Sequence, residues 1–249
     1  MNFYFCIHPT RTQAQHIAME LRDVIISLGG SCVEDPSQAD FTVAIGGDGT
    51  VVSAWKEHDC PIIGINAGTL GYLPRVEPTH ASDAIQAVFD GHYSLEKRMT
   101  LDCGIPGEES VNALNEAALL HPDAGILRFT VLVDGTELIS YTADGMIVST
   151  PTGSTGYSLS AGGPIVDPIS EMLILTPIAP HTLVSRPILL SASSTVTLIS
   201  ETDAIIATDG ETVPIKADTP FEIRRSEKVM RFVSFGRENF ITRLRKKLT

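Results

Sequence analysis

The pattern of apolar residues changes near Lys97, and this change divides the chain into two kinds of fold. Before it, strand-like apolar runs such as Asn2–Ile7 alternate with segments whose apolar residues recur every three or four positions. That alternation predicts a mostly parallel sheet covered by helices, a Rossmann-like α/β domain. After it, short runs rich in Val, Ile, Thr and Ser are separated by Asp-Gly, Ser-rich and Pro turns, which predicts an antiparallel β-sandwich.

The expected elements follow from these two patterns. In the first domain we expect strands at 2–7, 31–34, 40–45 and 61–65, and helices from Thr10 or Thr12 to Leu28, at 49–58 and at 82–89. In the second we expect strands at 129–133, 138–142, 145–150, 173–177, 188–200, 204–208, 221–224 and 229–234. Residues 239–248 have helical spacing, and we expect this helix to return to the first domain. The predicted domains are therefore 1–97, completed by 235–249, and 98–234.

Charge and cysteine usage exclude several classes of protein. The 249 residues carry a net charge of −12, which argues against a broad nucleic-acid or anionic membrane surface. No apolar run reaches the length of a membrane span, and the N-terminus does not resemble a secretory signal. The four cysteines are widely spread, without metal-ligand spacing, which suits free thiols in a reducing compartment. We expect a soluble cytoplasmic protein without a protein-held metal centre.

A glycine turn with an acid at its centre is the first candidate site. Gly46-Gly47-Asp48-Gly49-Thr50 follows an apolar strand and opens a helix. Ligands of open α/β sheets collect at that edge, where glycine amides and a helix N-terminus favour phosphate. Asp48 either caps the helix or, because a carboxylate repels phosphate, faces a hydroxyl or a magnesium ion. The P-loop, GxGxxG, HExxH and GxSxG motifs are all absent.

Two further stretches carry polar groups in unusual places. Residues 144–164 run from a strand into a dense series of hydroxyl and glycine residues, which is either a long polar loop or a surface for polyphosphate and ribose. Thr155, Tyr157 and Ser160 are the side chains that we place at a ligand there. Asn115-Glu116 interrupts the apolar run 111–120, and is either a satisfied structural pair or a pair that binds hydroxyl and amide groups in a cleft.

Together these motifs closely resemble the NAD kinase family. The family pattern of a GGDGT loop, an N-x-G-x-LG-(F/Y)-L segment, an Asn-Glu pair, a DG-x-x-V-STPTGSTAY-x-LS-x-GGP block and a TPI-x-PH-x-L segment is matched, in order, by 46–50, 66–73, 115–116, 144–164 and 176–183. The GGDGT loop alone is shared with lipid kinases, whereas the STPTGST block is far more specific. The resemblance implies transfer of the ATP γ-phosphate to the 2′-hydroxyl of the adenosine ribose of NAD, giving NADP.

The resemblance also implies roles for individual residues. Asp48 corresponds to the general base, which accepts the ribose proton or orients the hydroxyl through Mg²⁺ or another divalent cation bound with ATP. The remaining positions are expected to bind the substrates: Gly46, Gly47, Gly49 and Thr50 the phosphates, Tyr72 the adenine, Asn115 and Glu116 the adenosine and its ribose, Asp144 and Ala179 the other end of the dinucleotide, and Thr155, Gly156, Tyr157 and Ser160 the NAD cleft between the domains. The family further implies a homodimer or homotetramer, with some NAD contacts crossing a subunit interface.

The chain departs from the family pattern at three positions. Ser53 and Thr142 replace basic residues that many relatives carry, and Gly156 replaces the alanine of GSTAY. The loss of two cations puts the phosphate contacts of the dinucleotide in question. Two other functions stay open: a lipid kinase, which has no use for Asn115-Glu116 or the STPTGST block, and an NAD sensor without turnover, against which the intact Asp48 argues.

Overall fold

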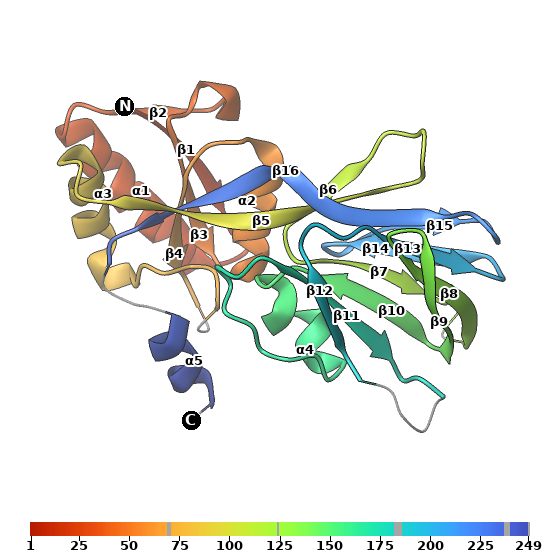
Figure 1. Cartoon of the computed structure of the whole chain (residues 1–249). Coiled ribbons are helices and arrows are strands. Elements are labelled where there is room, and N and C mark those ends of the chain that lie inside the picture. The colour runs from red at the N-terminus through yellow and green to blue at the C-terminus, as the bar shows by residue number, and fades with distance from the viewer. Residues whose placement is uncertain (69–70, 124, 182–185, 237–239, 249) are drawn as a thin grey trace. The chain divides into compact units, whose positions relative to one another are not determined.

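Figure 1 shows the computed structural model, which describes residues 1–68, 71–123, 125–181, 186–236 and 240–248. Four positions used above, Thr69, Leu70, Thr182 and Leu183, lie outside the described residues, as does the first residue of the predicted C-terminal helix, Asn239. The chain forms two compact units, one made of Met1–Lys97 and Met230–Thr249 and the other of Arg98–Val229. None of the helices in the described part of the chain is long and apolar enough to cross a membrane.

Unit 1 is an α/β domain around a parallel sheet. Its strand order is β2 (Ser31–Val33), β1 (Asn2–Ile7), β3 (Phe41–Gly46) and β4 (Ile62–Asn66), and β4 pairs in parallel with the end of β16 (Phe221–Ser234). The helices α1 (Thr12–Ser27) and α3 (Ala81–Phe89) lie on one side of these strands and α2 (Asp48–Glu57) on the other (Figure 1). Every residue of β3 and β4 is buried because both faces are covered. The last helix, α5 (Phe240–Leu248), also belongs to this unit.

Unit 2 is an antiparallel β domain with one apolar core. A six-stranded sheet has the order β12 (Ile188–Ser191), β11 (Met172–Ile178), β10 (Gly145–Ser149), β7 (Glu116–Leu120), β14 (Ala204–Thr208) and β15 (Glu211–Ile215). A second set has the order β16, β13 (Val196–Ser200), β8 (Leu127–Val133) and β9 (Thr136–Ala143), beginning with the start of β16. Strand β5 (Ser94–Gly104) pairs with β16 and with β6 (Val111–Ala113). Alternate side chains of both sets, such as Phe129 and Val148, meet in the core, so the predicted combination of α/β and antiparallel β folds is confirmed.

Some strand predictions were wrong. The run 188–200 forms two strands because Ser191 turns the chain, its Oγ accepting from Ser193 N at 3.2 Å and its carbonyl from Ser194 N at 3.1 Å. Conversely, the runs 221–224 and 229–234 are one continuous strand, β16, through the polar residues 225–228, three of which are charged. The strands β5, β6, β7 and β15 were not predicted. The residues of β5, β6 and β15 are largely charged, polar or exposed, whereas β7 is apolar and mostly buried after Glu116, and its run 111–120 was considered only for its polar pair.

Candidate functional site

The acid of the glycine turn does not cap its own helix. Strand β3 ends at Gly46, Gly47 is the N-cap of α2, and Asp48 is the first helical residue. No side chain caps this helix start; instead Thr50 N and Val51 N donate to Gly47 O at 3.1 and 3.3 Å. The Asp48 carboxylate accepts from the next loop along the sheet edge, from Tyr72 N at 3.1 Å and Leu73 N at 2.9 Å. The helix-cap interpretation of Asp48 is therefore wrong.

The glycines around Asp48 fall into two groups. A Cβ on Gly46 would meet Thr50 Oγ1 at 2.1 Å, and one on Gly71 would meet Asp48 Oδ1 at 2.3 Å, so packing requires both glycines. A Cβ on Gly47 or Gly49 would meet nothing within 4 Å. The backbone at these two glycines consequently lies beside open space, in which a ligand has room to approach it.

That space is part of a pocket of about 660 Å³. Its lining comes from the loop and helix after β3, from the end of β1 with the loop that follows, and from Gly71. Sequence reasoning missed Arg11 here, which lines the pocket and donates from Nη1 to Ala67 O at 2.8 Å. The available signal was its place directly after a parallel strand, at the same edge as Asp48. Ser53, which stands where many relatives carry a basic residue, lines the pocket too. Arg11 therefore brings a positive charge to the pocket in which the basic residue at position 53 is missing.

The aromatic residue of this region is Tyr72, which is partly buried. Burial and the nearby Asp48 carboxylate raise the pKa of its hydroxyl. The described part of the segment 66–73 thus brings Tyr72 and Asp48 together, with the Tyr72 amide on the carboxylate.

In unit 2, Asn115 and Glu116 are held by a residue that the sequence analysis did not single out. The Asp209 carboxylate accepts from Leu114 N at 2.7 Å, Asn115 N at 2.8 Å and Glu116 N at 3.2 Å. Asp209 and Gly210, with φ of 46° and 87°, form the turn between β14 and β15. The Asp-Gly pair was interpreted only as a turn signal, because the targets of its carboxylate are more than 90 residues away.

Glu116 has an unsatisfied buried oxygen. Burial, followed by the charge of Asp209, raises the pKa of Glu116 to about 7. Its Oε2 is buried and makes no hydrogen bond within the described structure. A Cβ on Gly156 would lie 3.4 Å from this oxygen, so the glycine turn of the STPTGST block borders it. The oxygen can accept a ligand's hydroxyl, or donate to a ligand when the carboxyl is protonated.

The hydroxyls of the STPTGST block divide into internal and outward groups. Thr150 Oγ1 donates to Leu114 O at 2.7 Å, Ser154 Oγ accepts from Val166 N at 3.1 Å, and Ser158 Oγ bonds Thr176 Oγ1 at 2.9 Å; all three are buried. The predicted site residues are more accessible: Thr155 ends a short 3₁₀ turn, while Tyr157 and Ser160 bound the four-residue helix α4 (Tyr157–Ser160) and are exposed.

Asp144 and Ala179 meet at the other end of β10. Asp144 N donates to Ile178 O at 3.0 Å, which places Asp144 beside Ala179, an exposed residue with φ of 43°. Within the same strand, Ser149 pairs with Glu116. Four residue steps of strand separate Gly145 from Ser149, roughly 13 Å. The two predicted ends of the dinucleotide site thus correspond to the two ends of one strand.

The structure offers little for a protein-held metal. Among the residues that it describes, no three His, Cys, Asp or Glu side chains gather to hold an ion. Asp48 can supply one or two carboxylate oxygens, so a divalent cation here would take its remaining ligands from phosphate and water, as Mg²⁺ commonly does.

Comparison with known proteins gives the same family for both halves of the chain. Residues 7–93 match the family model described as ATP-NAD kinase N-terminal domain, and residues 114–235 match ATP-NAD kinase C-terminal domain. The NAD kinase of Thermococcus gammatolerans is 43% identical over 80% of this chain and 74% of its own length. That of Pectobacterium atrosepticum is 36% identical over 94% of this chain and 84% of its own length.

Solved structures of NAD kinase and NADH kinase are also similar to this chain. The Archaeoglobus fulgidus NAD kinase in complex with ATP has a TM-score of 0.80 and 30% identity, covering 99% of this chain and 96% of its own. Yeast NADH kinase complexed with NADH has a TM-score of 0.89, covering 100% of this chain and 87% of its own; at 22% identity it shows the fold alone.

Proposed function

Because this chain belongs to the NAD kinase family, we propose that it transfers the γ-phosphate of ATP to the 2′-hydroxyl of the adenosine ribose of NAD, making NADP. The observation that carries the proposal within this chain is the Asp48 carboxylate, set at the start of α2 in a pocket bordered by open glycine amides. Phosphoryl transfer depends mostly on positioning and on neutralising charge. The glycine backbone and Arg11 of this pocket support the first, whereas its two carboxylates, Asp48 and Glu57, leave most of the neutralisation to a cation bound with ATP.

Asp48 is proposed as the general base. The two amides that bind it take one lone pair on each oxygen and fix the orientation of the carboxylate. Since an ionised carboxylate has about four acceptor sites, further sites stay available for the ribose hydroxyl. The hydroxyl proton passes to Asp48 as the ribose oxygen attacks the γ-phosphorus and the bond to ADP breaks.

The donor phosphates are proposed to lie over Gly46, Gly47, Gly49 and Thr50. The N-terminus of α2 and the open amides of Gly47 and Gly49 favour anions. Arg11 supplies positive charge at the same pocket, which offsets the serine at position 53. A divalent cation bound with ATP and contacted by Asp48 would neutralise phosphate charge.

The NAD side of the proposal rests mainly on unit 2. Asn115 and Glu116 would bind the adenosine and its ribose, with the buried Glu116 Oε2 as an acceptor in need of a partner. Thr155, Gly156, Tyr157 and Ser160 would contact NAD beside this pair, and Asp144 and Ala179 its other end. Tyr72 of unit 1 is assigned to the adenine.

One assay tests the reaction and the base together. Purified protein incubated with NAD, ATP and MgCl₂ is expected to form NADP, measured with an NADP-specific dehydrogenase. Asp48→Asn is expected to keep NAD affinity and to lose turnover by about 10²- to 10⁴-fold, the usual contribution of general acid–base catalysis. Asp83→Asn is the matched control, because Asp83 also lies in the first turn of a unit 1 helix but outside this pocket.

Each alternative has its own outcome. Phosphorylation of a lipid without NADP formation would support the lipid kinase, and bound NAD without any product would support the sensor. Near-normal turnover of Asp48→Asn would remove Asp48 from the role of base.

We also propose that the enzyme is a cytoplasmic homodimer or homotetramer in which some NAD contacts cross the subunit interface. All four cysteines, Cys6, Cys32, Cys60 and Cys103, are free, as a reducing compartment would keep them.

A further inference from the structure

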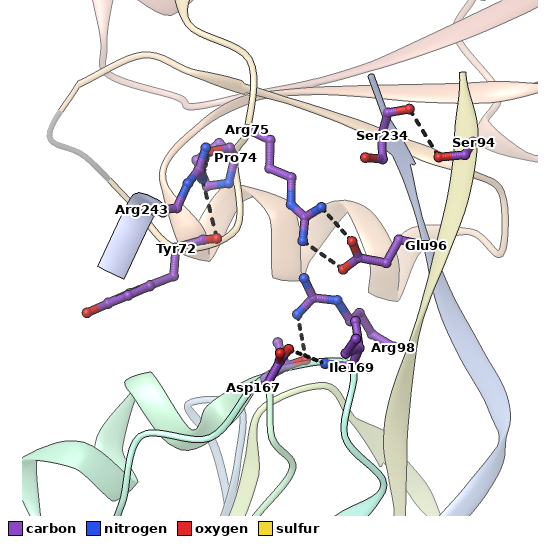
Figure 2. A network of polar contacts seen from close by, with 11 residues as sticks. Tyr72, Pro74, Arg75, Ser94, Glu96, Arg98, Asp167, Ile169, Ser234 and Arg243 are labelled. Carbon is purple, nitrogen blue, oxygen red and sulfur yellow. Dashed lines mark hydrogen bonds and ion pairs between the residues drawn. The ribbon is translucent and has the colours of Figure 1, made fainter. Parts of the chain in front are cut away.

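The C-terminal helix reaches the loop that holds Asp48. Arg243 of α5 is 3% exposed, and its Nη1 donates to the carbonyls of Gly71 at 3.5 Å, Tyr72 at 3.4 Å and Pro74. Figure 2 shows Arg243 against Pro74 with the contact to the Tyr72 carbonyl drawn. The Asp48 carboxylate binds the same loop through the amides of Tyr72 and Leu73. All of these residues belong to unit 1.

The two side chains bind opposite ends of the same peptide groups. The Gly71 carbonyl and the Tyr72 N–H are the two poles of one planar peptide, and the Tyr72 carbonyl and the Leu73 N–H are the poles of the next. The Arg243 guanidinium is at the oxygen pole of both, and the Asp48 carboxylate is at the hydrogen pole of both. A peptide dipole with a cation at its oxygen and an anion at its hydrogen is stabilised at both ends, and each hydrogen bond polarises the other.

The arrangement is also tightly packed. Gly71, Leu73 and Pro74 are buried, and a Cβ on Gly71 would lie 2.3 Å from Asp48 Oδ1 and 3.0 Å from Pro74 Cδ. A buried guanidinium keeps its hydrogen bonds because an unpaired buried charge is costly. The peptides between Arg243 and Asp48 therefore have little freedom to rotate while the contacts persist.

We propose that Arg243 is a positioning residue for the reaction, which sets the orientation of the Asp48 carboxylate through the peptides joining Gly71, Tyr72 and Leu73. The inference rests on the proposed role of Asp48 and extends it to the C-terminal helix. Loss of the guanidinium frees the carbonyl poles, the peptides rotate, and the carboxylate loses its alignment with the attacking hydroxyl. Substrate binding to the glycine amides and to unit 2 does not depend on this contact.

The test is a double-mutant cycle between Arg243→Met and Asp48→Asn. Arg243→Met keeps an apolar stem and removes the charge, and is expected to lower kcat by roughly 10- to 100-fold, the scale of a small misplacement of a catalytic group, with KM for ATP changed less than about threefold. KM for NAD is expected to rise as well, because Tyr72, assigned above to the adenine, lies between the two affected peptides. In the Asp48→Asn background the same substitution is expected to cause no further loss of kcat, because the residue it positions is already disabled. Arg243→Lys, which keeps one cationic donor, should recover part of the activity.

The controls separate positioning from stability and from the proposed function. Arg245→Met removes an exposed cation of the same helix and is expected to leave kcat near wild type. If Arg243→Met does not fold, Arg243→Gln, whose amide can still donate to a carbonyl, replaces it in the cycle. Near-normal kcat of the Arg243 variants, or losses that multiply with that of Asp48→Asn, would overturn the inference. Retained turnover of Asp48→Asn alone would instead overturn the role of Asp48.

Discussion

At the scale of the residue, Glu116 is a carboxyl group whose ionisation is opposed by the fold. Its pKa is raised from 4.5 to about 7 by burial and by Asp209, so the folded chain holds a proton that the unfolded chain has released between these values. The contribution of this proton to the free energy of unfolding is fully present below about pH 4.5 and is lost as the pH rises through about 7.

Glu116→Gln is therefore expected to remove this pH dependence. Between pH 5 and 8 the wild-type free energy of unfolding should fall relative to that of the variant by on the order of 1–3 kcal/mol, measured by urea titration at each pH. Glu108→Gln, at an exposed loop position, serves as the control and should keep a constant difference from wild type. A constant difference for Glu116→Gln as well would contradict the prediction.

At the scale of the element, the β14–β15 hairpin holds the backbone of Asn115 and Glu116 through Asp209, although none of its own residues is assigned to a ligand. Asp209→Ala would leave three backbone N–H groups around Asn115 without their acceptor, and is expected to cost about 2–4 kcal/mol of unfolding free energy and to raise KM for NAD. The matched control is Asp134→Ala, at another Asp-Gly turn with φ of 51°, where the carboxylate accepts from a single backbone N–H among the described residues, that of Thr195 at 2.8 Å. Equal losses of stability for the two variants, in urea unfolding, would argue against the proposed role of the hairpin.

The elements that could be predicted from the sequence are those that bury an unbroken apolar pattern. Strand β1 and strand β14 coincide with their predicted ranges because their side chains alternate or are enclosed by covering layers. Strand β5 was not predicted because its first half contains the consecutive charged residues Glu96, Lys97 and Arg98. Glu96 is satisfied by Arg75 at 2.7 Å through both guanidinium nitrogens (Figure 2), a partner 21 residues away that no local pattern reveals.

The residues of the candidate site also divide into those that the sequence predicts and those that it does not. The motif residues could be found because they occur as contiguous runs in a fixed order, and the structure brings Asp48 to Tyr72 and Glu116 to Gly156. Arg11, Asp209 and Arg243 were missed, because each acts on backbone groups far along the chain. A side chain that binds amides or carbonyls places no demand on the identity of the partner residue, so the sequence carries no paired signal for it.

At the scale of the whole molecule, the proposed assembly has a direct measurement. Strand β12 is an edge of the six-stranded sheet, and its Leu189 is 50% exposed, which is a feature that proteins usually cover. We expect light scattering during gel filtration to give the mass of two or four chains. A monomer at assay concentrations would rule out NAD contacts from a second subunit.

Unit 1 is built from both ends of the described chain, with unit 2 inserted between Lys97 and Met230. On the ribosome, the first part of unit 1 is therefore made early but stays without β16 and α5 until all of unit 2 has emerged. At about 5–20 residues per second, that interval is several seconds or more, during which β4 has an open edge. Unit 2 can fold in this time, so unit 1 begins to be made before unit 2 and is completed after it, and the open edge of β4 is exposed to other chains during that interval.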